Sequence, residues 1–203
     1  GGMGRLVDAL VDGIGDDQRT GAAVAGLARD GDAWRLEPAG VTARAVVVAT
    51  PAFAAAPLVT PHAPAAAEVL AAIEHASVTL VALAVPRAGI DRFLVPRSAG
   101  LRLTACSWVS SKWPHLDVDP DVALLRASVG RAGDDRAMAL DDDALVAAVL
   151  ADLKTTMGLR AAPTDVRVSR WPRSFPQPRP EHLARVAAAE AAVAAVPGLA
   201  LTG

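Results

Sequence analysis

Cys106, Ser107 and His115 are the residues of this chain that come nearest to a nucleophile with its base. A catalytic thiol or hydroxyl needs an imidazole within hydrogen-bond reach, and nearness in sequence does not supply that geometry. The sequence also lacks the Gly-x-Ser-x-Gly turn that presents a nucleophilic serine. We therefore interpret Cys106 as a small buried side chain. No hydrolytic activity is predicted, and the catalytic residues stay unassigned.

Histidine and aspartate side chains could bind a metal ion. The 4 histidines have neither His-x-x-x-His spacing nor cysteine partners, so no zinc site is predicted. Asp141, Asp142 and Asp143 form a cluster of carboxylates at the point where a helix is expected to begin. Asp141 can cap that helix, and its two neighbours lie in the first turn, where the helix dipole favours negative charge. The structural interpretation is preferred, and no metal is predicted.

Arginine is concentrated in the last third of the chain, where guanidinium groups could bind the carboxylates or phosphates of a ligand. Solvated surface arginine is the simpler interpretation. Trp108, Trp113 and Trp171 lie in or beside predicted strands, and core packing is the expected role of each. The arginines concerned are Arg160, Arg167, Arg170, Arg173, Arg179 and Arg185.

The composition is that of an ordinary folded protein. A net charge of -2 and a pI near 6.1 give no attraction to nucleic acid, so no nucleic-acid partner is predicted. Apolar runs such as 78–85 are far shorter than a bilayer span, so no transmembrane segment is predicted, although peripheral contact with a membrane stays open. Cys106 is the only cysteine, which excludes an internal disulfide and favours a cytoplasmic location.

The elements that would position these residues alternate between helices and strands. Apolar spacing from Leu6 to Ile14 predicts a short helix. Strands are predicted over 21–29, 33–37 and 43–50, the last being an alanine and valine run expected to be buried on both faces. The segment 51–64, rich in proline and alanine, predicts a crossing between two structural units. A helix over 65–74 follows.

The second unit is predicted as a mixed sheet with one strong helix. That helix is predicted from the Asp141 cap to Gly158, with a buried stripe along one face. A strand over 165–171, a proline-rich turn, a helix over 180–196 and the start of a buried strand at 199–203 complete the chain. The fold class is therefore mixed α/β. The strands expected in the sheet are 77–85, 93–96, 101–109 and 122–130, and the stripe contains Leu145, Val146, Val149, Leu150, Leu153 and Met157.

Residues 105–115, with the sequence Ala-Cys-Ser-Trp-Val-Ser-Ser-Lys-Trp-Pro-His, resemble a block of the coproporphyrinogen and protoporphyrinogen oxidases. These enzymes are members of the flavin amine oxidase superfamily. The order and spacing of motifs agree with their actinobacterial forms over nearly the whole chain. Besides the block, the resemblance covers 1–6, 93–96, 124–135, 141–158, 170–172 and 175–177.

The resemblance implies that FAD is held by a Rossmann-like domain, with a porphyrinogen over the flavin against a mixed-sheet substrate domain. Residues 1–56 and 184–203 would belong to the FAD-binding domain and 57–183 to the substrate domain. The implied reaction removes hydrogen from the porphyrinogen in successive two-electron steps, with molecular oxygen reoxidising the flavin. Coproporphyrinogen III and protoporphyrinogen IX both stay open as the substrate in haem biosynthesis, and the former is preferred.

The same resemblance implies roles for five residues. Val24 would contact the flavin nucleotide through its backbone, and Trp171 would lie beside the flavin ring system. Leu94, Ser107 and Ser128 would line the tetrapyrrole pocket. No particular arginine is assigned to the propionates of the substrate.

Some features depart from the family pattern. Its Pro-Gln-Tyr is Pro176-Gln177-Pro178 here, and its Gly-His is Glu181-His182, which alters a local loop. The glycine-rich Gly-x-Gly-x-x-Gly motif of the family is absent. We therefore expect an internal fragment that alone binds FAD weakly or not at all and is inactive. Two alternatives are another flavin amine or carotenoid oxidoreductase and a non-catalytic remnant that binds a tetrapyrrole.

Overall fold

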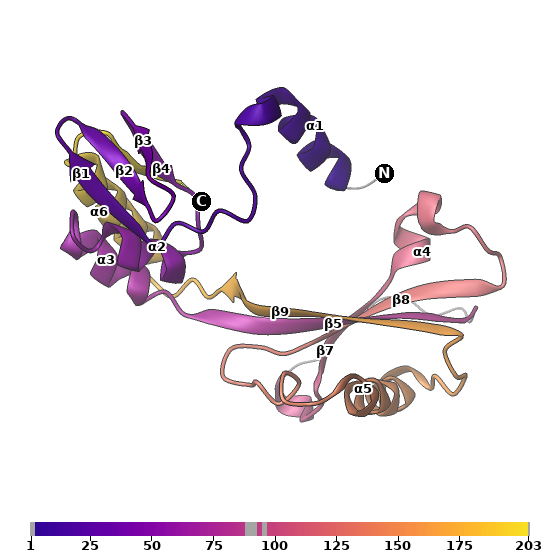
Figure 1. Ribbon diagram of the computed structural model, residues 1–203. Helices are drawn as coiled ribbons and strands as arrows, with labels where there is room; N and C mark the ends of the chain where they lie inside the picture. Colours follow the sequence, from indigo (N-terminus) through magenta and orange to yellow (C-terminus); the bar gives the residue numbers. More distant parts are fainter. Residues whose placement is uncertain (1–2, 88–92, 95–96, 203) are drawn as a thin grey trace. The chain divides into compact units, whose positions relative to one another are not determined.

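The computed structural model describes residues 3–87, 93–94 and 97–202, and they form two compact units (Figure 1). The first unit contains the chain up to Ala72 and the chain from Glu181 onward, and the second is Ile73–Pro180. These divisions lie at 72/73 and 180/181, whereas the sequence predicted crossings at 56/57 and 183/184. The first unit is thus assembled from two segments that are separated by the whole of the second.

The first unit contains two small sheets. Strands β1 (Gly26–Asp30), β2 (Ala33–Glu37) and β3 (Val41–Ala43) form an antiparallel meander. Strand β4 (Val46–Val48) pairs in parallel with β10 (Leu199–Leu201), so the beginning and the end of the chain meet in one sheet. The strand predicted over 33–37 is confirmed at both ends.

Four helices belong to the first unit, and three of them form its core with the strands. Trp34 is fully buried at the centre of this core, and its indole N–H donates to the carbonyl oxygen of Pro197 at 3.3 Å. In the first helix, by contrast, Leu6, Val7, Leu10 and Ile14 are exposed and Val11 is half-buried. The helices are α1 (Gly4–Ile14), α2 (Ala52–Val59), α3 (Pro64–Ala71) and α6 (His182–Ala194), and a short 3₁₀ turn, η1 (Gly15–Asp17), follows α1.

Two predictions for the first unit were wrong in detail. The segment 51–64 is not a bare crossing, because α2 forms there with Pro57 inside it and packs Leu58 and Val59 into the core. Burial of this apolar segment outweighs the cost of a helical proline. The run 43–50 is not one strand buried on both faces, since β3 and β4 join different sheets and Val47 is 62% exposed.

The second unit is built on a five-stranded sheet in the order β6-β7-β8-β5-β9. Every described pair in it is antiparallel, so the mixture of strand directions expected for this sheet is not found among the described strands. The described part of the predicted strand 93–96 is β6, and residues 95–96 lie outside the described residues. The strands are β5 (His75–Pro86), β6 (Phe93–Leu94), β7 (Leu103–Trp108), β8 (Val122–Val129) and β9 (Asp165–Pro176).

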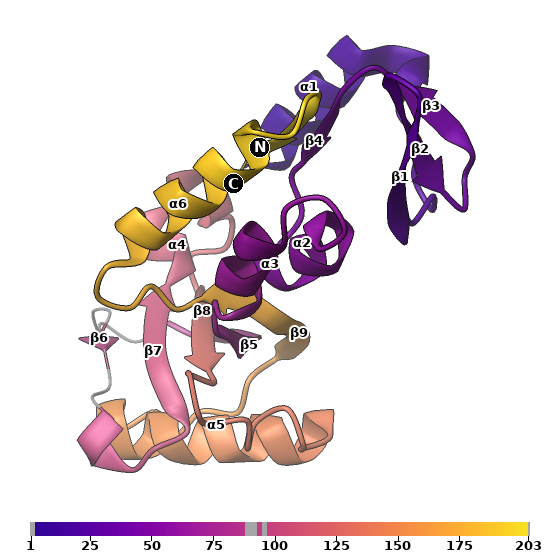
Figure 2. The same ribbon diagram turned by 90° about the vertical axis from the view of Figure 1, so that its left-hand side faces the viewer.

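Helix α5 (Asp142–Met157) covers one face of this sheet, as both views show (Figures 1 and 2). Its predicted boundaries and stripe are confirmed: Asp141 accepts the backbone N–H of Ala144 at 2.8 Å, and Gly158 ends the helix with φ 71°. Leu145, Val149 and Leu153 are fully buried against the sheet. The shorter helical segments are η2 (Arg97–Ala99), α4 (Val109–Lys112) and η3 (Pro114–Leu116).

Strand β9 is longer than the sequence predicted. It was expected to end near Trp171 at a proline-rich turn, but it continues through Pro172 to Pro176. Proline is tolerated there because β9 is an edge strand, paired on one side only, to β5.

Candidate functional site

The two faces of the second-unit sheet differ in what they contact. Along β5 the side chains of Val81, Leu83 and Val85 are buried in the core under α5, whereas the intervening Leu80 and Ala82 point to the other face. Leu80 is half-buried and Ala82 is exposed, although β5 is an inner strand. We call the face opposite α5 the open face.

One cross-strand row on the open face contains two of the residues predicted to line the tetrapyrrole pocket. Ser128 of β8 pairs with Leu80 of β5 on one side and with Ala105 of β7 on the other. Residues that pair directly across antiparallel strands share a face. The full row, by register, is Leu94, Ala105, Ser128, Leu80 and Ser169.

Ser107 lies in the next row of the same face. It pairs with Arg126 of β8, which pairs with Ala82 of β5, which pairs with Arg167 of β9. Ser107 and Ser128 are both half-buried, and both therefore have hydroxyl groups at the surface of a sheet whose other face is core. The register thus brings Leu94, Ser107 and Ser128 onto three adjacent strands.

Trp171 lies on the open face of β9, opposite Val78. Its side chain is 55% exposed, so the core packing that its strand position suggested is wrong. The same correction applies to Trp113, which is 48% exposed, whereas Trp108 is buried as predicted.

A bulge directly follows Trp171 on β9. Residues 172–174 of β9 lie opposite the single residue Ser77 of β5, so the pairing register shifts by two residues between Ala76 and Val78. Arg173, within that bulge, has φ 48°, and its backbone N–H donates to the Ser77 hydroxyl oxygen at 3.2 Å. Bulges of this kind redirect side chains near functional sites.

Gly130 permits the backbone approach beside this bulge. It has φ +96°, and a Cβ atom added there would lie 2.5 Å from the carbonyl oxygen of Ser77. The sequence indicates no role for Gly130, because a glycine at a strand end does not reveal which backbone it will contact. The structure shows that its missing side chain lets the end of β8 touch β5 next to Val78.

Val24 lies in the first unit, immediately before β1, and its half-buried side chain packs against that core. The next residue, Ala25, donates its N–H to the carbonyl oxygen of Glu37 at 2.7 Å. The backbone N–H and C=O of Val24 itself have no hydrogen-bond partner among residues 3–87, 93–94 and 97–202. They are therefore available to a ligand such as the edge of an adenine ring. Val24 belongs to the first unit and Trp171 to the second, and a site that they share is a prediction.

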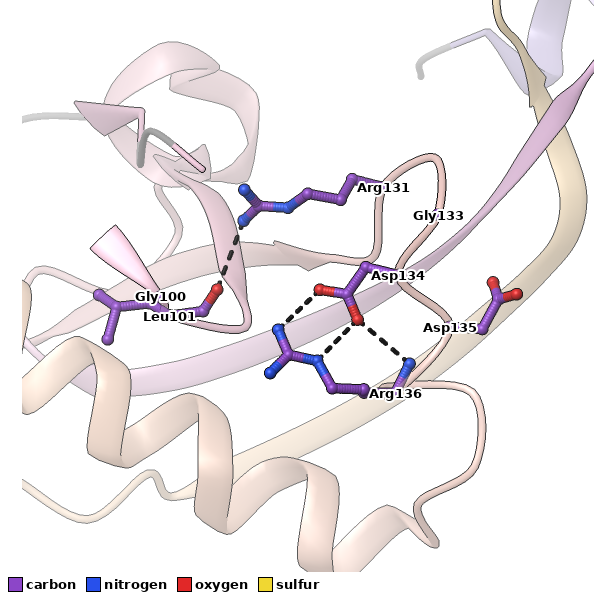
Figure 3. Close-up of a pocket in the computed structure, with 7 residues that line it drawn as sticks. All are labelled: Gly100, Leu101, Arg131, Gly133, Asp134, Asp135 and Arg136. Atoms are coloured by element: carbon purple, nitrogen blue, oxygen red, sulfur yellow. Dashed lines mark hydrogen bonds and ion pairs between the residues drawn. The ribbon is translucent and has the colours of Figure 1, made fainter. Parts of the chain in front are cut away.

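A separate hollow of about 340 Å³ lies where the end of β8 meets the start of β7 (Figure 3). Several of its polar groups are paired: the Arg136 guanidinium donates two hydrogen bonds to the Asp134 carboxylate and its backbone N–H donates a third, and Arg131 donates to the Leu101 carbonyl oxygen. The buried Nε of Arg131 has no partner among the described residues. The hydrogen bonds from Arg136 lower the pKa of Asp134 to about 2. We interpret this hollow as part of a turn that these hydrogen bonds stabilise. Its lining residues are Gly100, Leu101, Arg131, Gly133, Asp134, Asp135 and Arg136.

Cys106 is buried on the core side of β7, and desolvation raises the pKa of its thiol to about 11. A thiol of this kind is protonated at neutral pH and is not a nucleophile. This agrees with the interpretation of Cys106 as a packing residue.

The sheet of the second unit thus has one face covered by α5 and one open face, and this unit lies in sequence between the two segments of the first. Residues 1–203 match the family described as flavin containing amine oxidoreductase, and the chain belongs to that family. The family is one of flavin-dependent oxidoreductases, and its cofactor is FAD.

Relatives named coproporphyrinogen III oxidase match much of the chain. That of Bacillus subtilis is 35% identical over 90% of this chain and 40% of its own length. That of Mycobacterium tuberculosis is 40% identical over 79% of this chain and 35% of its own length. The chain therefore spans about two fifths of the length of these relatives. The resemblance inferred from the motifs is confirmed.

Solved structures support the fold. A protein of Exiguobacterium sp. 255-15, assigned as a protoporphyrinogen oxidase, superposes with a TM-score of 0.78 at 28% identity, over 89% of this chain and 41% of that one. Cyclohexylamine oxidase of Brevibacterium oxydans IH-35A gives a TM-score of 0.75 at 20% identity, over 100% of this chain and 47% of that one. The predicted mixed α/β fold of the flavin amine oxidase type is confirmed.

The residues present fit a flavin. The unpaired backbone groups of Val24 suit a nucleotide edge, and the exposed indole of Trp171 offers a flat apolar surface to an aromatic ring system. Among the described residues, no helix combines the length and hydropathy needed to cross a bilayer.

Proposed function

We propose that this chain provides the substrate-bearing sheet, and part of the flavin-binding fold, of an FAD-dependent oxidase that acts on a porphyrinogen. Coproporphyrinogen III is the preferred substrate, because the relatives from Bacillus and Mycobacterium bear that name. Protoporphyrinogen IX is the second candidate, supported by the name of the Exiguobacterium protein. Haem biosynthesis in the cytoplasm is the proposed setting.

The observation that supports this function most directly is the composition of the open face. Serine, alanine and leucine residues of four strands share this face, with the exposed Arg126 and Arg167 in the row of Ser107 and the exposed Trp171 on the edge strand β9. A macrocycle can lie flat on such a surface and exclude water from it. The proposed roles are substrate contact for Leu94, Ser107 and Ser128, flavin contact through the backbone for Val24, and packing beside the flavin for Trp171.

FAD, when bound, supplies the acceptor for the hydrogens that leave the macrocycle, with molecular oxygen as the proposed final acceptor. The contribution of this chain is then to bind and orient the substrate so that one edge faces the acceptor. An acid–base pair on the open face is not required for that role, and none is assigned.

Oxidation of reduced tetrapyrroles by a flavin-loaded protein that includes residues 1–203 tests the proposal. Coproporphyrinogen III and protoporphyrinogen IX are supplied in parallel, and the appearance of porphyrin fluorescence is followed against a control without protein. We expect oxidation of both, faster with coproporphyrinogen III. Oxidation of an amine substrate instead would favour the amine oxidoreductase alternative, and tetrapyrrole binding without oxidation would favour the non-catalytic one.

Trp171→Phe tests the proposed position of the indole. In the same flavin-loaded protein, we expect this change to alter the flavin absorbance and fluorescence while leaving the melting temperature nearly unchanged, because the side chain is 55% exposed. Trp113→Phe is the matched control, since that indole is 48% exposed and has no proposed flavin contact. Identical flavin spectra for the two variants would remove Trp171 from the cofactor site.

A further inference from the structure

Two arginines flank one alanine on the open face. Arg126 of β8 and Arg167 of β9 each pair directly with Ala82 of the intervening β5. Because adjacent strands lie about 4.8 Å apart, the two backbones are separated by roughly 10 Å. Both arginines and Ala82 are exposed, so two cationic side chains on one face flank a residue with only a methyl side chain.

These two arginines differ from others of the same sheet in their partners. Arg87 forms an ion pair with Asp117, and Arg170, whose strand position faces α5, forms one with Asp142. Arg126 and Arg167 have no ion pair or hydrogen bond from their side chains to any residue of the described ranges. Like charges held on one sheet face repel each other, so an anionic ligand that meets both would stabilise the arrangement.

The rest of the open face restricts what such an anion can be attached to. The next row contains Ser128, Leu80 and Ser169, and Trp171 lies four residues beyond Arg167 along β9, or about 13 Å away. Asp165, on the other side of Arg167, is the acidic residue nearest to it on this strand, and its Oδ1 accepts the backbone N–H of Val166 at 2.8 Å. Along β9 the face therefore changes from aromatic at Trp171, through the small polar side chain of Ser169, to cationic at Arg167.

We infer that Arg126 and Arg167 form a carboxylate-binding pair for the propionate groups of the substrate, an inference that rests on the proposed function. A porphyrinogen on the serine, alanine and leucine residues of the face would direct one edge toward Trp171 and the carboxylates of its opposite edge toward Arg126 and Arg167. Guanidinium groups bind carboxylates through two parallel hydrogen bonds, which fixes the orientation of the ring as well as its affinity. Coproporphyrinogen III and protoporphyrinogen IX both carry at least two propionates, so the pair suits either substrate.

Arg126→Gln and Arg167→Gln test the pair in a flavin-loaded protein that includes residues 1–203. Each change is expected to raise the KM for coproporphyrinogen III roughly tenfold to a hundredfold, the usual effect of losing a charged hydrogen bond, with kcat changed far less. Arg160→Gln is the matched control, because Arg160 is exposed but lies outside the sheet. Arg126→Lys is expected to recover part of the affinity.

Binding of the oxidised product, coproporphyrin, gives a measurement that does not depend on turnover. Quenching of tryptophan fluorescence should report weaker binding in both glutamine variants, and the tetramethyl ester should bind all forms alike. If the parent oxidises porphyrinogens but the variants keep its KM and its affinity for coproporphyrin, the pair is refuted and the proposed function stands. If coproporphyrin binding depends on the arginines while the parent oxidises no porphyrinogen, the pair is supported and the proposed function fails. Equal weakening of acid and ester would refute carboxylate recognition.

Discussion

At the scale of single residues, backbone conformation and packing separate glycines that look alike in the sequence. Gly130 and Gly133 lie three positions apart and both have positive φ, +96° and +74°. Only Gly130 faces another strand closely, with the Ser77 carbonyl oxygen 2.5 Å from a built Cβ, whereas nothing lies within 4 Å of one at Gly133. Comparing substitutions at these two glycines therefore separates the cost of backbone strain from the cost of a steric clash.

Gly130→Ala is expected to lower the free energy of unfolding by about 2–4 kcal/mol, from strained φ together with displacement of β5 at its bulge. Gly133→Ala should cost only about 1 kcal/mol, because the strain acts there without a clash. Urea denaturation of both variants measures the difference. A similar loss of stability in the two would mean that the approach of β8 to β5 adjusts freely.

The carboxyl group of Asp134 has a lowered pKa, which predicts how the stability of the protein depends on pH. Its pKa of about 2 lies below the ordinary value of 3.8, chiefly because Arg136 donates hydrogen bonds to it. A depressed carboxyl pKa means that folding favours the charged form, so the stabilisation is complete above pH 3.8 and is lost as the pH falls toward 2. The ion pair is local and partly exposed, so its contribution at neutral pH is below about 1 kcal/mol.

Arg136→Gln should therefore return the pKa of Asp134 toward its ordinary value. Titration of the side-chain carboxyl carbon by NMR measures this directly, with Arg160→Gln as a control that leaves the Asp134 pKa low. Stability of the Arg136→Gln variant should also depend less on pH over the acidic range in which the parent loses the ion pair. An unchanged titration would assign the low pKa to the neighbouring Arg131 instead.

At the scale of elements, α5 is the helix whose ends are fixed by side-chain chemistry that the sequence displays. Asp141→Ala removes the cap on the Ala144 N–H and should lower the free energy of unfolding by about 1 kcal/mol. Asp143→Ala, in the first turn but without the capping bond, should cost only about 0.3 kcal/mol through the helix dipole. Chemical denaturation of both variants measures the difference, and equal losses would show that charge, not capping, stabilises this end.

The elements that could be predicted are those with local signals. The cap and terminal glycine of α5 lie within a few positions of the helix ends that they set, and the predicted ends of this helix are confirmed. The helix α2 could not be predicted, because Pro57 opposes it locally and only tertiary burial of Leu58 and Val59 stabilises it.

The candidate site on the open face also could not be predicted from local sequence signals alone. Motif resemblance indicated Ser107, Ser128 and Trp171, but alternation alone could not assign them to one face. The register shifts by one residue between Leu103 and Ala105 on β7, so the residues of β7 that point away from α5 change at that point. Glu181 replaces a glycine of the family pattern, and its backbone nevertheless has the positive φ, 66°, that glycine favours.

At the scale of the whole molecule, the first unit depends on contacts between two segments that are separated in sequence by the whole of the second unit. Strand β10 pairs in parallel with β4, and the Trp34 indole donates to Pro197, a residue 163 positions further along the chain. Gly198 permits this closure, because with φ +73° an added Cβ would lie 2.7 Å from the carbonyl oxygen of Arg44. The proposed flavin-binding unit therefore cannot form from the amino-terminal segment alone.

Flavin retention is the property that follows from this organisation. A dinucleotide is held mainly through its pyrophosphate, by backbone N–H groups of a glycine-rich turn at a helix N-terminus, and residues 1–203 contain no Gly-x-Gly-x-x-Gly. Val24 would offer an adenine-edge contact and Trp171 a ring contact, but neither compensates the phosphate charge. A protein limited to residues 1–203, purified with added FAD and shown to be folded by circular dichroism, should therefore be nearly colourless. A folded yellow protein with one flavin per chain would mean that a different set of residues binds the phosphates.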